Sequence, residues 1–180
     1  MGERPEYAAA AESVGRMLAR RDIALVYGGG NIGIMGVLAR AALAAGGRVT
    51  GIIPQKLYEA VSHVELTELI VVKDMHERKA RMAAASDAFI ALPGGIGTFE
   101  ELFEVMAWRH IGYHAKPVGL LEVAGFYAPL LGFLRRVADE GFIKEAHLAD
   151  LVVDDDPDRL LDRLAAHGPI AETKTAEFRA

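Results

Sequence analysis

The sequence predicts an α/β fold: a single domain built on a Rossmann-like, doubly wound parallel sheet. Short apolar runs alternate along the chain with stretches of helical periodicity, which is typical of strands connected by helices. The apolar runs are continuous, which indicates strands buried on both faces. With 180 residues and 52% hydrophobic content, the chain is long enough to bury one full core. We therefore expect one domain over 1–168 and a polar C-terminal tail over 169–180.

Periodicity and turn residues predict the elements in order. The first expected helix is alanine-rich, with a proline suited to its first turn; a glycine pair ends the second, and an aspartate caps the third. Four of the expected helices have both ends predicted: 5–20, 74–85, 126–140 and 157–166. Two more follow glycine-rich turns: one comes after the turn that begins at 28 and continues to about 45, and the other begins at 98. The expected strands are 23–27, 48–53, 68–72, 88–92, 116–123 and 151–153, with a less regular stretch at 55–65.

Composition narrows the classes of partner and compartment. A net charge of −5, with no basic stripe, argues against nucleic-acid binding. The absence of cysteine excludes a disulfide framework and thiolate zinc sites, and it fits a reducing, cytoplasmic setting. No apolar run approaches the roughly 20 residues that span a bilayer, and the first residues lack the apolar core of a signal peptide. We expect a cytoplasmic protein without a membrane partner.

The stretch 88–101 has the strongest functional signal. An apolar run leads into Pro93 and a glycine-rich turn, and a helical pattern follows from Thr98. Unpaired amides and the positive end of the helix dipole would converge at this turn and favour a phosphate. Thr98 and Glu101 lie three residues apart, so they share one face of the first helical turn. A hydroxyl and a carboxylate beside a phosphate cradle indicate a site.

An alternative interpretation is that the glycines only let the helix pack closely on the strand. Acidic residues also favour the start of any helix, and adjacent Glu100 and Glu101 point about 100° apart, so at most one would face a ligand. A second glycine-rich turn follows the strand at 23–27. In a parallel sheet both turns lie beyond the C-terminal strand ends, where ligands bind, and this favours the site over simple packing.

The turn at 28–33 contains Gly28, Gly30 and Gly33 in the spacing of a dinucleotide-binding fingerprint. Dinucleotide binders also place an acidic residue at the end of the next strand, and none ends the run at 48–53 here. A P-loop signature is absent as well. The sequence therefore favours a mononucleotide or a sugar phosphate over NAD or a nucleoside triphosphate.

A third informative stretch, 74–79, follows the expected strand 68–72. Arg78 offers a planar fork suited to a phosphate or a purine edge, and Lys79 adds a point charge. For Glu77 and Lys79, a solvated helix face remains the alternative.

Together these motifs resemble the Lonely Guy (LOG) family of cytokinin riboside 5′-monophosphate phosphoribohydrolases. The resemblance extends over about 5–166. It rests on three stretches, Gly28-Gly29-Gly30 with Met35-Gly36, Met75-His76-Glu77-Arg78-Lys79, and Pro93-Gly94-Gly95-Ile96-Gly97-Thr98-Phe99-Glu100-Glu101. Members have often carried the label lysine decarboxylase, which nothing here supports, because no lysine is evidently placed for a Schiff base.

The resemblance implies hydrolysis of the N-glycosidic bond of an N6-modified AMP, or of AMP itself, without a cofactor or metal. The family's essential arginine and glutamate correspond to Arg78 and Glu101. We expect Glu101 to stabilise the oxocarbenium-like sugar, to orient water and to contact the ribose hydroxyls. We expect Arg78 to hold the purine or the leaving nitrogen, where negative charge develops. The further substrate-binding residues expected are Gly30, Met75, Lys79, Gly94, Gly95, Gly97, Thr98 and Glu100. Members are typically homodimers.

Two departures from the family pattern carry expectations of their own. Members usually begin with a central strand that ends in a glycine-serine turn, and this sequence starts just after it, so either its start is truncated or the protein does without that strand. Many members also carry a substrate-holding glutamate where Ala60 stands here, with Glu59 adjacent. The alternative function is a non-catalytic nucleotide-binding protein of the same fold.

Overall fold

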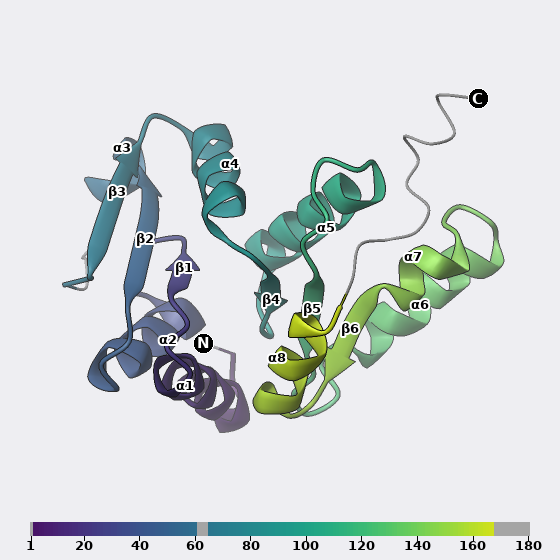
Figure 1. Cartoon of the computed structure of the whole chain (residues 1–180), viewed down its shortest axis with the longest axis horizontal. Coiled ribbons are helices and arrows are strands. Elements are labelled where there is room, and N and C mark those ends of the chain that lie inside the picture. The colour runs from purple at the N-terminus through teal and green to yellow at the C-terminus, as the bar shows by residue number, and fades with distance from the viewer. Residues whose placement is uncertain (1, 61–64, 168–180) are drawn as a thin grey trace. The chain divides into compact units, whose positions relative to one another are not determined.

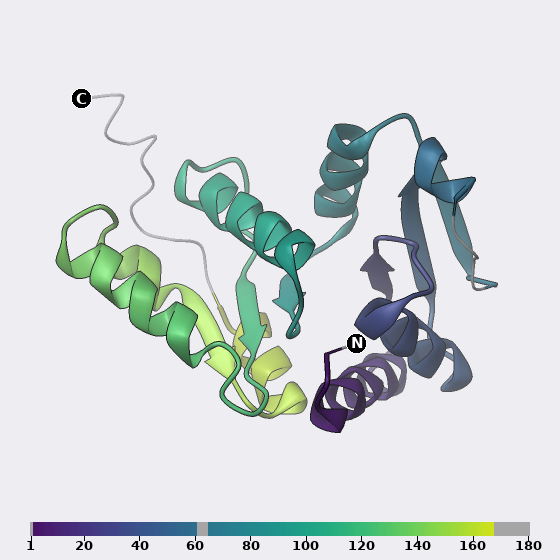
Figure 2. The same cartoon turned by 180° about the vertical axis from the view of Figure 1, so that it is seen from behind.

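The computed structural model describes residues 2–60 and 65–167, which form two compact units divided between Ser86 and Asp87. Each unit holds one three-stranded, all-parallel sheet with helices packed against it (Figures 1 and 2). Within the described residues, no helix is long and apolar enough to cross a membrane. The tail expected at 169–180 lies outside the described residues.

Unit 1 alternates helices and strands from its first helix onward. Its elements are α1 (Pro5–Arg20), β1 (Leu25–Tyr27), α2 (Gly33–Ala44), β2 (Val49–Pro54), α3 (Gln55–Tyr58), β3 (Glu68–Val72) and α4 (Met75–Ala85). The sheet order is β1-β2-β3, with Leu25 opposite Val49 and Thr50 opposite Glu68. The helix α4 packs along this sheet, and α2 contacts β1 and β2.

A close helix crossing joins α1 to α2. A Cβ atom at Gly15 would lie 2.6 Å from the carbonyl oxygen of Leu38 and 2.8 Å from the amide nitrogen of Ala42. Only glycine lets the two backbones approach this closely. The crossing buries an apolar stripe of α1, formed by Ala11, Val14, Met17 and Leu18.

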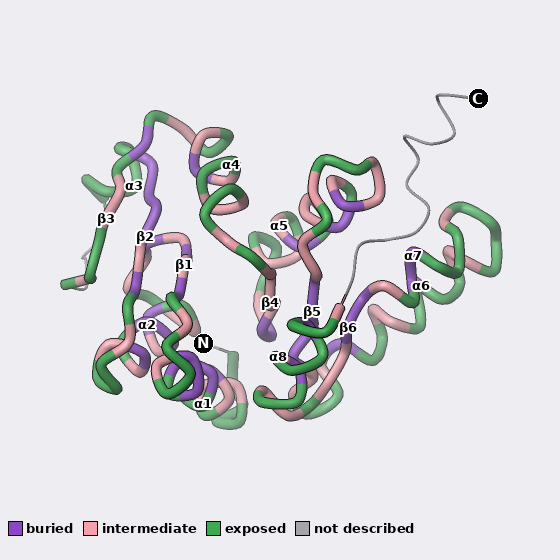
Figure 3. The backbone as a smooth tube through the Cα atoms, in the orientation of Figure 1, coloured by how far each residue is buried: buried purple, intermediate pink, exposed green. Residues whose placement is uncertain are grey.

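Unit 2 repeats the alternation around its own core. Its elements are β4 (Phe89–Ala91), α5 (Ile96–His110), β5 (Val118–Leu121), α6 (Ala128–Asp139), α7 (Glu145–Ala149), β6 (Leu151–Asp154) and α8 (Pro157–Ala165), with the strand order β4-β5-β6. The central strand β5 is buried along its whole length (Figure 3). Its alternate residues pack in different places: Val118 and Leu120 join a core with α5 and α6, whereas Gly119 lies against Leu160 and Leu164 of α8.

The predicted α/β fold with parallel sheets is confirmed. Its hydrogen-bonded ladders, however, form two three-stranded sheets where one was expected, and within the described residues no ladder joins β1 to β4. The prediction of a single domain over 1–168 stays a prediction.

Element boundaries differ from the predicted ones in a few places. The strand expected to stop before Pro54 includes it. The β1–β2 pairing ends at Gly51, so Pro54 has a paired strand on one side only, where it lies opposite Val72, and the missing N–H leaves no ladder bond to β1 unmade. The stretch expected to be less regular contains the four-residue helix α3, and α7 was not predicted. Both helices are too short to display helical periodicity in the sequence.

Candidate active site

The glycine-rich turn of unit 2 connects β4 to α5. After Ala91 the buried residues Leu92 and Pro93 lead into the turn, and Gly95 is the N-cap of α5. A Cβ atom at Gly94 would overlap the hydroxyl oxygen of Thr98, so the Thr98 side chain folds back over the turn. Close packing thus explains why position 94 is glycine.

Packing does not explain Gly95 or Gly97. A Cβ atom at either position would meet nothing within 4 Å among the described residues, and neither glycine has a positive φ. The N-cap residue of α5, Gly95, has no side chain that could cap the helix start. The backbone at this helix N-terminus is therefore open to an approaching anion, which the helix dipole and the first amides would attract. This favours the ligand-binding interpretation over close packing alone.

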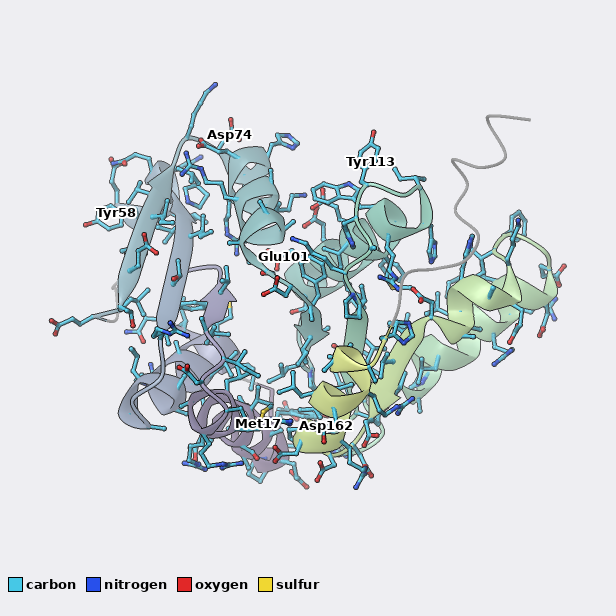
Figure 4. All side chains as sticks on the ribbon, viewed as in Figure 1. Met17, Tyr58, Asp74, Glu101, Tyr113 and Asp162 are labelled. Carbon is cyan, nitrogen blue, oxygen red and sulfur yellow. The ribbon has the colours of Figure 1, made fainter. Side chains whose placement is uncertain are left out.

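Two carboxylates follow the turn on α5. Glu101, labelled in Figure 4, is partly buried and Glu100 is exposed. Thr98 lies three residues before Glu101 on α5, which puts the two on the same side of the helix. The structure thus places the expected phosphate-binding turn, the hydroxyl and the carboxylate together at one end of α5.

Arg78, in unit 1, lies at the C-terminal ends of β1 and β2. Its side chain is 7% exposed, and its Nε donates a hydrogen bond to the carbonyl oxygen of Ile52, at 3.1 Å. A Cβ atom at Gly28 would overlap one of its terminal nitrogens, so the glycine just after β1 makes room for the guanidinium. The arginine is therefore held in a fixed orientation at the sheet edge where the first glycine-rich turn begins.

The helix α4 that carries Arg78 has a strongly capped start. The Asp74 carboxylate accepts a hydrogen bond from the Glu77 amide at 2.9 Å, and the Glu77 carboxylate accepts one from the Lys73 amide at 2.9 Å. The Lys73 amide and the Arg81 guanidinium, 2.8 Å away, hold the pKa of Glu77 below its ordinary value. These contacts give Glu77 a structural role, and Asp74 is the cap that the sequence predicts.

The turn at 28–33 is shaped by its glycines and by one arginine. Gly29 and Gly33 have φ values of +75° and +66°, a conformation that side chains disfavour. The Arg40 guanidinium donates hydrogen bonds to both the side chain and the backbone carbonyl of Asn31, fixing the turn to α2. Gly30 lies beside Met35, whose Cε would be 3.4 Å from a Cβ at that position.

Each unit thus holds one group of the predicted site residues. Unit 1 contains Arg78, Gly30, the 42% exposed Met75 and the partly buried Lys79. Unit 2 contains Gly94, Gly95, Gly97, Thr98, Glu100 and Glu101. Among the described residues, no group of histidine and acidic side chains could hold a metal ion.

The sequence reasoning missed two residues that shape these groups. The first is Gly28, which makes room for Arg78. Its position directly after an expected strand was a signal for a site residue, but Gly30 was the residue of that turn expected to bind substrate. Tyr127 donates a hydrogen bond from its buried hydroxyl to the carbonyl oxygen of Leu92, at 2.7 Å, just before the turn of unit 2. No motif marks Tyr127. Glu59, next to Ala60, accepts a hydrogen bond from Gln55.

Comparison with known proteins identifies relatives over most of the chain. Residues 35–164 match the family described as "Possible lysine decarboxylase". The chain is 50% identical over 154 residues to a cytokinin riboside 5′-monophosphate phosphoribohydrolase of Rhodococcoides fascians, covering 84% of this chain and 78% of the relative. It is 46% identical over 179 residues to the cytokinin riboside 5′-monophosphate phosphoribohydrolase LOG5 of Arabidopsis thaliana. This match covers 99% of this chain and 78% of the relative.

Solved structures similar to this chain have the same fold. The molybdenum cofactor binding protein from Rippkaea orientalis gives a TM-score of 0.69 at 22% identity, over 91% of this chain and 88% of the other. The protein TM1055 gives a TM-score of 0.66 at 20% identity, over 92% of this chain and 91% of the other. At these identities the likeness concerns the fold alone. With its glycine-rich turns, its Arg78 and Glu101 motifs and its 44–51% identity to named relatives, the chain belongs to the LOG family of phosphoribohydrolases.

Proposed function

We propose that this protein hydrolyses the N-glycosidic bond of a cytokinin riboside 5′-monophosphate, of AMP, or of both, releasing the free base and ribose 5-phosphate. The names of relatives at 44% identity and above support the reaction class. The single structural observation that carries the proposal is the start of α5. Its open glycines stand beside Thr98 and Glu101, so a phosphate-binding helix end and a carboxylate occur together.

The phosphate would bind at the turn of unit 2. Gly94, Gly95 and Gly97 would present backbone amides to its oxygens, and the Thr98 hydroxyl would add a further donor. The positive end of the α5 dipole favours the dianion. Further substrate contacts are assigned to Gly30, Met75, Lys79 and Glu100.

Cleavage of the ribosyl bond builds positive charge on the sugar and negative charge on the departing base. The Glu101 carboxylate would stabilise the oxocarbenium-like sugar and orient the attacking water. Arg78 would bind the purine, where the negative charge develops, and its hydrogen bond to Ile52 keeps the guanidinium from reorienting. Neither step calls for a cofactor or a metal.

The second candidate function is non-catalytic nucleotide binding. The same glycine-rich turns would serve a carrier, but simple phosphate binding needs neither a buried arginine nor Glu101. The presence of both residues favours the enzyme. The label lysine decarboxylase has no support from a lysine suited to a Schiff base.

The sequence-based expectations about assembly belong to the same proposal. We propose a cytoplasmic homodimer that binds neither nucleic acid nor membranes, in keeping with the family resemblance and the net charge of −5. Light scattering coupled to size exclusion should then give about twice the 19.4 kDa chain mass. A monomer mass would contradict the dimer without affecting the proposed reaction.

The proposed reaction is tested by chromatographic detection of base release from AMP and from isopentenyladenosine monophosphate. Glu101→Gln should lower kcat by about 100-fold or more, as expected for loss of a catalytic carboxylate. Glu104→Gln, the same change on the same helix outside the proposed site, is the matched control. Near-normal turnover by Glu101→Gln would refute the mechanism, and binding without release by the wild type would favour the carrier.

A further inference from the structure

We propose that Tyr127 is a positioning residue for the phosphate-binding turn of unit 2, holding both the strand end and the helix start between which the turn runs. The inference rests on the proposed function of that turn.

The strand side of the turn is held by the Tyr127 hydroxyl. Tyr127 precedes α6 and is 0% exposed, and its hydroxyl donates a hydrogen bond to the carbonyl oxygen of Leu92, at 2.7 Å. Leu92 lies beyond the last residue of β4, so the β4–β5 ladder ends before it. The hydroxyl therefore fixes a backbone group at the point where the chain leaves the sheet and enters the turn.

The helix side of the turn is held by the ring of the same residue. The Phe99 ring, in the first turn of α5, packs edge-on against Tyr127, with centroids 6.4 Å apart and planes at 87°. Phe126 stacks on Phe99 and also meets Tyr127 edge-on. One side chain thus contacts the residues on both sides of Pro93–Thr98.

Tyr127 is itself fixed independently of its hydroxyl. Its backbone amide donates to both carboxylate oxygens of Glu122, at 3.0 and 3.3 Å, and the Glu122 amide donates to the carbonyl of Asp154 at 2.9 Å. Removal of the hydroxyl would therefore leave the ring in place. Packing alone would be served equally well by phenylalanine, so the hydroxyl's distinct contribution is its bond to Leu92. Burial raises the pKa of Tyr127, which keeps the phenol protonated as a donor.

The test compares Tyr127→Phe with Tyr113→Phe, the same chemical change at a side chain that is 77% exposed in the same unit (Figure 4). The Kd of ribose 5-phosphate, the proposed product, is measured by calorimetry, because AMP would be hydrolysed during the titration. Amide hydrogen exchange at 94–98 is measured without ligand. For Tyr127→Phe we expect Kd to rise about 5- to 10-fold and exchange at the turn to quicken, the effect of losing one buried hydrogen bond. Tyr113→Phe should match the wild type.

Leu134→Ala separates positioning from general loss of stability, because Leu134 is a buried α6 residue of the same core. It should lower Tm without changing Kd or the exchange rates at 94–98. The inference would be overturned if Tyr127→Phe had a lower Tm than the wild type but the same Kd and the same amide exchange rates at 94–98. If the wild type bound no ribose 5-phosphate and released no base from AMP, the proposed function would fail, whereas faster exchange at 94–98 in Tyr127→Phe would still support the positioning role.

Discussion

At the scale of single residues, unit 2 buries an arginine by surrounding it with acceptors. Arg109, 2% exposed, donates two hydrogen bonds to the Asp150 carboxylate and one to the carbonyl oxygen of Ala115. His167 contacts the same carboxylate, with 2.6 Å between Nε2 and Oδ1. A buried charge is tolerated only with such pairing, so this cluster is sensitive to the loss of any member.

The ionisation of Asp150 should appear in the pH dependence of stability. Burial acts to raise the pKa of Asp150, but the hydrogen bonds and charges of Arg109 and His167 outweigh it and hold that pKa below its ordinary value. A group with a lowered folded pKa stabilises the protein above its unfolded pKa, near 3.9, and loses that stabilisation as the pH falls through the folded pKa.

We therefore expect Asp150→Asn to be less stable than the wild type at pH 7, by about 3 kcal/mol, because it leaves Arg109 buried without its ion pair. The difference should shrink as the pH falls below about 4. Urea unfolding between pH 7 and pH 2 measures it, with the exposed Asp155→Asn as control. A stability difference that stayed constant over this range would show that the charge of Asp150 is not what matters.

At the scale of elements, two helical glycines should respond oppositely to the same change. Gly15→Ala places a methyl group against the backbone of α2, and we expect a loss of about 1–3 kcal/mol. Gly132→Ala lies within α6, where a Cβ would meet nothing within 4 Å among the described residues, and we expect a gain of about 0.5–1 kcal/mol from helix propensity. Chemical denaturation of both variants checks the prediction. Equal effects would mean that the helix crossing adapts.

The start of α5 gives a prediction in which stability and binding separate. Gly97→Ala puts a methyl group into open space, so we expect stability to be unchanged or slightly raised. The same methyl group would stand where the phosphate approaches, and we expect the Kd of ribose 5-phosphate to rise about tenfold, the equivalent of losing one hydrogen bond. Calorimetry of binding and of unfolding on one sample measures both. Unchanged affinity would argue that the phosphate binds elsewhere.

The elements that the sequence predicted best are those with the longest or clearest patterns. The helix Pro5–Arg20 and the strand Glu68–Val72 match their predicted bounds, because their apolar residues recur over the whole element. The five residues of α7 carry too little pattern to predict a helix. The glycine-rich turns were predicted because glycine and proline signal them locally. The bond from Tyr127 to Leu92 joins residues 35 positions apart, and no local pattern encodes such a contact.

At the scale of the whole molecule, the chain consists of two units that each contain a sheet and buried apolar side chains. Units with separate cores often open as separate cooperative blocks. The sequence has one tryptophan, Trp108, and it lies on α5 in unit 2. Its fluorescence therefore reports on unit 2, whereas far-ultraviolet circular dichroism reports on both.

We expect Gly15→Ala, in unit 1, to lower the urea midpoint seen by circular dichroism and to leave the fluorescence midpoint unchanged. Leu134→Ala, in unit 2, should lower the fluorescence midpoint. Transitions that coincide and shift together in both variants would instead show that the two units unfold as one.

The short connection from β5 to α6 is a surface loop, and loops of this kind usually tolerate insertions. Here Ala124 and Gly125 both have positive φ values, +52° and +78°, and reverse the chain direction. The reversal brings the Glu122 carboxylate to the Tyr127 amide, from which it accepts a hydrogen bond. An inserted residue would move the tyrosine away from Leu92. Variation in the length of this loop should therefore be selected against as strictly as change in the glycine-rich turn itself, although the loop need never touch a substrate.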